Sequence, residues 1–222
     1  MGRAKTSDYG NQFIGIYGVC GEHKLLLGTP CSSKLENACR EALDVEVHRM
    51  TVDGSGLLGI FCAMNSNGII VPEQASTSEK AAFKKLGLNV HVLKGRLSAC
   101  GNNLVINDKG GVANPEVPAA ELKKIGECLG IELVSTRIAG YPTVGAACMA
   151  TNKGFLAHTK TSAAELEMLE GALKVKGAIG SLNVGMPFVR LCALVNSKGY
   201  VVGESTTGFE MGRLEEALDF IG

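Results

Sequence analysis

One polar sequence motif occurs four times along this chain, and this repetition limits the possible folds more than any other feature of the sequence. Each copy places Asn or Thr three residues before a glycine, runs on through apolar residues and ends in a Glu. The copies are NSNGIIVPEQASTSE (65–79), NDKGGVANPEVPAAE (107–121), TNKGFLAHTKTSAAE (151–165) and NSKGYVVGESTTGFE (196–210). Their glycines, Gly68, Gly110, Gly154 and Gly199, recur every 42 to 45 residues. A fixed period of this length predicts an array of similar units.

A fifth, more divergent copy comes first. The stretch GEHKLLLGTPCSSKLE (21–36) has Lys24 at the glycine position, with Ser33 and Glu36 shifted by one residue. We therefore expect residues 1–222 to form one domain, in which residues 1–10 close the array into a ring. The five repeats are expected at about 11–54, 55–96, 97–138, 139–181 and 182–222. With 45% hydrophobic and 20% charged residues, such a chain can bury roughly 70% of its unfolded surface.

Charge and cysteine usage narrow the classes of partner. Lys plus Arg and Asp plus Glu both number 22, so no long-range field draws the protein to nucleic acid or to an anionic membrane. No apolar run approaches the ~20 residues of a membrane span, and the first ten residues lack the apolar core of a signal peptide. The eight cysteines form no C-x-x-C pair. We expect a cytoplasmic protein with reduced thiols, no metal and no cofactor.

The second copy predicts two strands joined by a hairpin. Residues 57–64, LLGIFCAM, form a nearly continuous apolar run, which is typical of a strand buried on both faces. Asn67 and Gly68 tolerate positive φ and favour a tight hairpin turn. Residues 69–72 then run back and end at Pro72.

A helix and a third strand are expected to follow. Ser76 and Glu79 have the spacing of a capping box, Gly87 ends the helix, and residues 88–93 alternate as a strand does. Each unit is thus predicted to be strand, hairpin, strand, helix, strand, which is an α/β fold. The other copies place Ser33/Glu36, Ser162/Glu165 and Thr207/Glu210 at the cap, Pro118 at the cap of the third copy, and Gly130 at the end of its helix.

The last copy stops at ALDFIG (217–222), before its third strand. An uncovered sheet edge promotes aggregation. We therefore expect residues 3–6 to pair at that edge and join the last unit to the first.

No motif for catalysis or metal binding is found among the polar residues. The four histidines His23, His48, His91 and His158 have no H-E-x-x-H spacing, and the chain has neither a G-x-S-x-G elbow nor a phosphate-binding loop. The glycine-rich stretch 54–59 leads into a predicted strand and not a helix, so a helix dipole cannot hold phosphate there.

A set of matching positions lies just before or within the first strand of each unit. The positions are Gly15, Gly59, Gly101 and Gly145, with Phe188 and Val189 in the fifth copy. If five units surround an axis, these residues crowd one end of it. In one reading, the glycines allow close packing of strands near the axis. Alternatively, this nearly uncharged end is a docking face for another macromolecule. The sequence leaves both readings open.

The chain resembles a known family, that of translation initiation factor 6 in its short archaeal form. The matching stretches are GLLGIFCAMNSNGIIVPE, LSACGNNLVINDKGGVANPE, YPTVGAACMATNKGFLAH and NSKGYVVGESTTGFE, in this order. The resemblance implies a pentein-type propeller, with five pseudo-symmetric ββαβ-like repeats around a fivefold axis. It also implies a monomer that binds the intersubunit face of the large ribosomal subunit and prevents joining of the small subunit.

The resemblance further implies a partner and a contact surface. Family members touch a ribosomal protein of the uL14 type near the sarcin-ricin loop of the rRNA, and have a role in maturation of the large subunit. Gly101 and Asn102, in LSACGN, match the family's LSALGN and are the first candidates for the contact. The corresponding face positions of the other units are Gly15, Gly59, Ile60, Gly145, Ala147 and Phe188.

Penteins also include guanidine-modifying enzymes that use a cysteine nucleophile and a histidine. Such a site needs an activated thiolate within reach of a base. Here Cys62, Cys100, Cys148 and Cys192 fall in or next to apolar strands, and no histidine lies near the C-terminus. We therefore expect a binding protein and not an enzyme.

Overall fold

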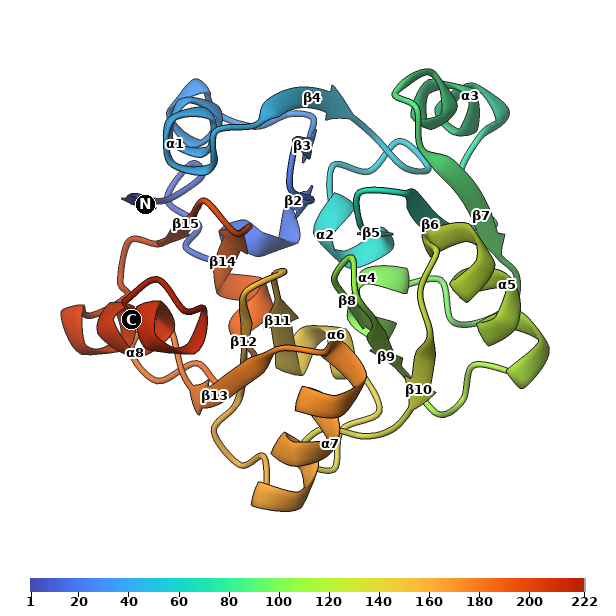
Figure 1. Ribbon diagram of the computed structural model, residues 1–222. Coiled ribbons are helices and arrows are strands. Elements are labelled where there is room, and N and C mark those ends of the chain that lie inside the picture. Colours follow the sequence, from blue (N-terminus) through green and yellow to red (C-terminus); the bar gives the residue numbers. More distant parts are fainter. Residues whose placement is uncertain (222) are drawn as a thin grey trace.

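The computed structural model of the protein describes residues 1–221, which form five three-stranded sheets arranged around a common centre (Figure 1). The first strands lie nearest the centre: β2 (Gly18–Cys20), β5 (Ala63–Met64), β8 (Leu104–Ile106), β11 (Cys148–Ala150) and β14 (Ala193–Val195). The second strands are β3 (Lys24–Gly28), β6 (Gly68–Pro72), β9 (Gly111–Ala113), β12 (Gly154–His158) and β15 (Gly199–Gly203).

An outer helix connects the second strand of each unit to a third strand. The helices are α1 (Ser33–Leu43), α3 (Thr77–Lys85), α5 (Ala119–Leu129), α7 (Ala163–Leu173) and α8 (Gly208–Ala217). The third strands are β4 (Glu46–Met50), β7 (Asn89–Leu93), β10 (Leu133–Ser135) and β13 (Lys176–Gly180). Within a unit the first two strands are antiparallel, and the second and third are parallel. The predicted order of strand, hairpin, strand, helix, strand is confirmed.

The N-terminal strand β1 (Gly2–Thr6) takes the place of the missing third strand in the last unit. It pairs in parallel with β15, in a register that sets Gly2 opposite Gly199 and Thr6 opposite Gly203. Tyr200 of β15 is fully buried beneath this region, and its hydroxyl donates to Glu215 at 2.6 Å. The predicted pairing of residues 3–6 at this edge is confirmed.

Each unit supplies most of one hydrophobic cluster, and residues of the preceding unit complete it. Leu25 and Leu35 of the first unit share one cluster with Leu194 and Val201 of the last. The other four clusters likewise combine one unit with its predecessor. A single unit therefore leaves part of its apolar surface for its neighbour to cover, which is the usual reason that repeats fold only as an array.

Two local predictions are wrong. Residues 57–64 are not one strand, because Leu58–Phe61 form a one-turn helix, α2, and only Ala63–Met64 pair as β5. In the first copy Ser32, and not Ser33, caps α1 by accepting from the N–H of Leu35. No capping box forms there because the N3 residue is Leu35, which has no carboxylate. Glu36 instead pairs with two arginines, Arg40 at 2.9 Å and Arg49.

The remaining helix ends follow the prediction. Ser76/Glu79, Ser162/Glu165 and Thr207/Glu210 form complete capping boxes, and Pro118 stands at the cap of α5. Gly87 and Gly130 have positive φ just past their helices. The hairpin glycine Gly68 does not. A Cβ there would lie 2.6 Å from the carbonyl oxygen of Cys128, at the end of the next unit's helix, so packing between units selects glycine.

Candidate docking surface

Five one-turn helices meet at one end of the molecule's centre. They are η1 (Ile14–Ile16), α2 (Leu58–Phe61), α4 (Cys100–Asn103), α6 (Val144–Ala147) and η2 (Val189–Cys192). Each contacts the next in chain order, and η1 also contacts η2. We call this end the short-helix face.

The four matching glycines hold these helices together. A Cβ on Gly59 would strike the carbonyl oxygen of Gly15, one on Gly101 that of Gly59, and one on Gly145 that of Gly101. A Cβ on Gly15 would strike the carbonyl oxygen of Arg190 in the last unit. All four glycines are buried. Of the two readings left open by the sequence, close packing explains these glycines.

The fifth matching position is occupied by Arg190, and the prediction of Phe188 and Val189 is corrected. In the second unit the glycine stands two residues after the N-cap, Leu57, and in the last unit the N-cap is Phe188. Two residues on from Phe188 is Arg190. The fifth copy has no glycine to align with those of the other copies, so its alignment to them placed Phe188, which is two residues too early, at this position.

Three of the proposed contact residues reach the surface. Ile60, Asn102 and Phe188 are partly exposed, whereas Ala147 is buried together with the glycines. Ile60 and Asn102 each follow directly after the matching position of their unit. The equivalent residues of the first and last units, Ile16 and Leu191, are also partly exposed. Counting one residue beyond each matching position would have found them. Apart from Arg190, which is also partly exposed, the accessible residues of the short helices are thus uncharged.

Asn102 differs from its neighbour in what its amide contacts. Asn103 is buried, donates to the carbonyl of Ala99 at 2.9 Å and accepts from Asn114 at 2.7 Å. The side chain of Asn102 makes no hydrogen bond within residues 1–221 and lies partly open to solvent. Its donors and its acceptor are therefore free for a partner molecule.

Phe188 belongs to an aromatic group that joins two units. Its ring lies 5.1 Å from that of Tyr141 and 5.3 Å from that of His158, both edge-on. His158 is buried, and its Nδ1 accepts from the N–H of Lys160 at 3.0 Å. Burial, followed by the charge of Lys160, lowers the pKa of His158, so its ring packs as a neutral aromatic group.

Exposed loops surround the short-helix face, and the glutamates of the capping boxes hold them. Glu79 accepts from the hydroxyl of Thr51 at 2.8 Å and from the N–H of Asp53 at 3.1 Å, in the loop before α2. Glu210 accepts from the N–H of Gly185 at 2.8 Å in the loop before η2. The tip of this last loop, Val184, is 70% exposed. The repeated glutamate therefore stabilises both a helix end and a loop, and its second role was not predicted.

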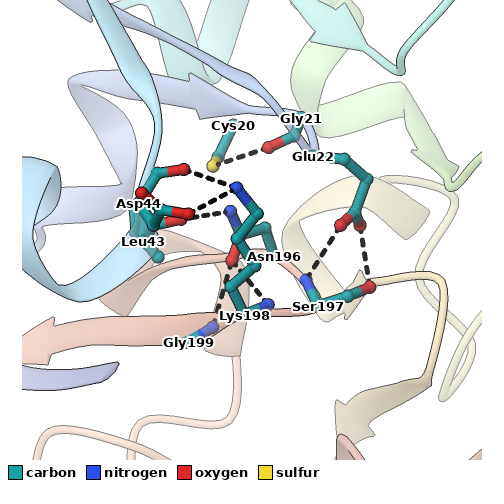
Figure 2. Close-up of polar contacts among 9 residues, drawn as sticks. All are labelled: Cys20, Gly21, Glu22, Leu43, Asp44, Asn196, Ser197, Lys198 and Gly199. Atoms are coloured by element: carbon teal, nitrogen blue, oxygen red, sulfur yellow. Dashed lines mark hydrogen bonds and ion pairs between the residues drawn. The ribbon is translucent and has the colours of Figure 1, made fainter. Parts of the chain in front are cut away.

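The opposite end of the molecule is formed by the hairpin turns, and Figure 2 shows how two of them interlock. The amide of Asn196 donates to the carbonyl of Leu43 at 2.9 Å and accepts from the N–H of Lys198 at 3.0 Å. The hydroxyl of Ser197 donates to Glu22 at 2.9 Å. The Asn-x-x-Gly motif is thus a structural element, as predicted, and its side chains form hydrogen bonds between one unit and the next.

The thiols offer no ready nucleophile. All eight cysteines are free, and burial raises the pKa values of Cys20, Cys100 and Cys192 to about 12. Thiols with such pKa values are protonated at neutral pH and react poorly. Among residues 1–221 no cluster of His, Cys, Asp or Glu has the geometry to hold a metal ion. In the same range no helix is both long and apolar enough to cross a membrane.

Comparison with known proteins gives one consistent result. The sequence profile of the eIF-6 family matches residues 3–217. Translation initiation factor 6 of Pyrococcus horikoshii is 37% identical over 215 residues, which cover 94% of this chain and 95% of the relative. The proteins of the same name from Haloquadratum walsbyi and Thermoplasma acidophilum are 33% and 35% identical, and the alignments cover 98% and 96% of this chain and 96% and 98% of the relatives. A match of this extent establishes that the chain belongs to the eIF-6 family.

Proposed function

We propose that this protein is a translation initiation factor that binds the large ribosomal subunit at its intersubunit face and prevents joining of the small subunit by occupying its place. The partner is a ribosomal protein of the uL14 type, close to the sarcin-ricin loop of the rRNA. Binding of this kind also suits a role in maturation of the large subunit. The protein acts as a monomer in the cytoplasm, and no covalent bond is made or broken.

The observation that carries the proposal is the free amide of Asn102, on a surface formed by five short helices in which Arg190 is the one charged residue. Interface cores are typically depleted in charged residues, and a few polar groups fix the register of the partner. Ile16, Ile60 and Leu191 add partly exposed apolar side chains at the corresponding positions of three other short helices. A stable complex buries roughly 1,200–2,000 Å² in total, so the contact extends to the loops around this face.

A closed ring gives this surface the rigidity that exclusion requires. We propose that the five units form a five-bladed propeller of the pentein type. Its support lies in the contacts between the last unit and the first, namely β1 on β15, Asn196 on Leu43 and Arg190 on Gly15. A rigid body placed on one subunit blocks the other without any change of shape.

Co-sedimentation with purified large subunits tests the proposal. The protein should pellet with large subunits, and small subunits added afterwards should fail to form joined ribosomes. If large subunits sediment without the protein, or join small subunits normally while the protein is bound, the proposal is wrong.

Variants of Asn102 locate the surface. Asn102→Asp and Asn102→Lys introduce a charge that an apolar contact would have to desolvate, so each should weaken subunit binding while leaving the unfolding temperature within a few degrees of wild type. The matched control is Lys109→Asp, a charge change at an exposed position in the hairpin turn beyond β8. Normal binding by both Asn102 variants would exclude the short-helix face.

A further inference from the structure

A small cavity lies at the common centre of the five units, and every unit contributes to its wall. Its volume is about 20 Å³. The wall includes Cys20, Met64, Ile106, Ala150 and Val195, one from the innermost strand of each unit (Figure 1). The surrounding residues are apolar, with one exception.

The exception is Arg190, which also lines this cavity. Its Nε is enclosed and has no hydrogen-bond partner within residues 1–221. Arg190 as a whole is partly accessible. A guanidinium carries five N–H donors and no acceptor, so it requires an acceptor that the protein does not supply here.

The neighbouring thiols do not neutralise this charge. The groups whose charge would act on Arg190 are Cys20, Cys62 and Cys148. Burial raises the pKa of Cys20 to about 12 and raises the pKa values of Cys62 and Cys148 as well, so all three are neutral thiols at pH 7. Burial lowers the pKa of Arg190, but a guanidinium starts so high that it keeps its proton.

Carboxylates near the axis are engaged elsewhere. Glu22 and Asp108 line a second small cavity toward the hairpin turns, whose wall does not include Arg190. Glu22 accepts from Ser197, and Asp108 accepts from Asn152 at 2.6 Å. Among residues 1–221 no carboxylate therefore pairs with Arg190, so a counter-charge for its partly accessible side chain can come from solution.

We propose that the axial cavity is a binding site for a single monatomic anion, a halide such as chloride, held by the guanidinium of Arg190. A cavity of this volume admits one particle of about the size of a water molecule and excludes a tetrahedral oxyanion. Arg190 occupies the position that the other four units fill with glycine, so the site exists in one copy per chain. Because the wall combines all five units, the anion binds only the assembled fold and stabilises it.

Crystals of the full chain, grown without halide and soaked in sodium bromide, test the site directly because bromide scatters anomalously. The expected result is an anomalous peak in the axial cavity beside Arg190, which is absent from Arg190→Met. A wild-type cavity that contains only a water molecule, or nothing, and no anomalous peak would overturn the proposal.

Thermal unfolding tests the same site in solution. In sodium bromide at ten times the dissociation constant, the wild-type midpoint should lie about 3 to 6 °C above that in sodium gluconate of equal ionic strength. Arg190→Met should lose this difference, as should Arg190→Gly, which restores the residue of the other units. Arg137→Met, at an exposed arginine, should keep it. Equal bromide shifts in all four proteins would mean a general salt effect and would reject the site.

Discussion

The side-chain amide of Asn196 donates a hydrogen bond to the carbonyl oxygen of Leu43 at 2.9 Å, across 153 residues of sequence. The acceptor is the last residue of α1, whose carbonyl has no partner within its own helix. The same amide orders its own turn by accepting from Lys198 and Gly199. One side chain thus satisfies a helix end in the first unit and shapes a hairpin in the last.

Replacing Asn196 with Ala should therefore weaken the contact between the last and first units. The buried amide makes three hydrogen bonds, and its loss leaves the carbonyl of Leu43 without a partner, so we expect a loss of about 2–3 kcal/mol in the free energy of unfolding. The corresponding fall in the unfolding temperature is about 5 to 10 °C. Asn65→Ala, which removes the same bridge between two internal units, should have a similar effect.

The control for this pair is Asn89→Ala. Its amide donates to the carbonyl of Cys128 at 3.3 Å, but the contact is exposed, so its loss should cost less than about 1 kcal/mol. Differential scanning calorimetry of the three variants measures the comparison. If Asn196→Ala were no more destabilising than Asn89→Ala, the bridge between the last and first units would be unimportant for stability.

Gly59→Ala should be among the most damaging small substitutions in the chain. Its new methyl group would strike the carbonyl oxygen of Gly15, which belongs to backbone that neighbouring units fix. Overpacking of this kind costs about 3 kcal/mol, equivalent to a fall of about 6 to 12 °C in the unfolding temperature. The measurement is thermal unfolding followed by circular dichroism.

The matched control is Gly171→Ala. Gly171 lies in the last turns of α7 with open space around its Cα, so alanine should stabilise the protein by about 0.5–1 kcal/mol. The two substitutions are chemically identical and should have opposite signs. A Gly59→Ala protein as stable as wild type would show that the short helices do not need their close approach.

Much of each unit could be predicted because the signals are local. Ser76 and Glu79 have the spacing of a capping box and mark the start of α3, and Pro72 ends a strand by lacking an N–H. The same spacing at Ser33 and Glu36 places the cap of α1 one residue late. The one-turn helix Leu58–Phe61 was missed because a short apolar run has no periodicity that separates a strand from a single helical turn. The position of this helix depends on the close approach of Gly59 to the carbonyl oxygen of Gly15, which lies in another unit.

The candidate site was harder to predict than the fold for the same reason. Gly101 and Asn102 are adjacent in sequence, yet one is buried against the neighbouring unit and the other is partly exposed. Only the packing of units decides which of them a partner can touch. Arg190 was missed because the last copy has no glycine to align, so its position became apparent only from the cap at Phe188.

Glu79 should make stability depend on pH in the acid range. Burial alone would raise its pKa, but hydrogen bonds from Ser76, Thr51, Asp53 and Gly54 outweigh this and lower it to about 2. The unfolded value is about 4.3. Because the folded pKa is the lower one, the carboxylate stabilises the fold above about pH 4, and this contribution is lost as the pH falls from about 4 to 2.

Glu79→Gln should accordingly reduce the free energy of unfolding by about 1–2 kcal/mol at pH 7, a figure that allows for partial solvent exposure of the group. Its difference from wild type should vanish near pH 2. Urea unfolding at several pH values measures this. Glu41→Gln, at an exposed position on α1, should differ little from wild type throughout. A constant difference between Glu79→Gln and wild type at every pH would contradict the proposed role of the charge.

The proposed docking surface predicts a shallow salt dependence of subunit binding. Its accessible residues Ile16, Ile60, Asn102 and Leu191 are uncharged, Arg190 is the one charged residue of the short helices, and the chain as a whole is neutral. A protein held by about 6 to 10 phosphate contacts loses about 10³ to 10⁵ in affinity between 50 and 200 mM salt. Binding through a protein partner releases few counterions, so we expect a loss of less than about tenfold. Co-sedimentation with large subunits in gluconate salts measures the affinity without occupying a halide site. A thousandfold loss would show that contacts to rRNA phosphates, and not the uncharged face, hold the protein on the subunit.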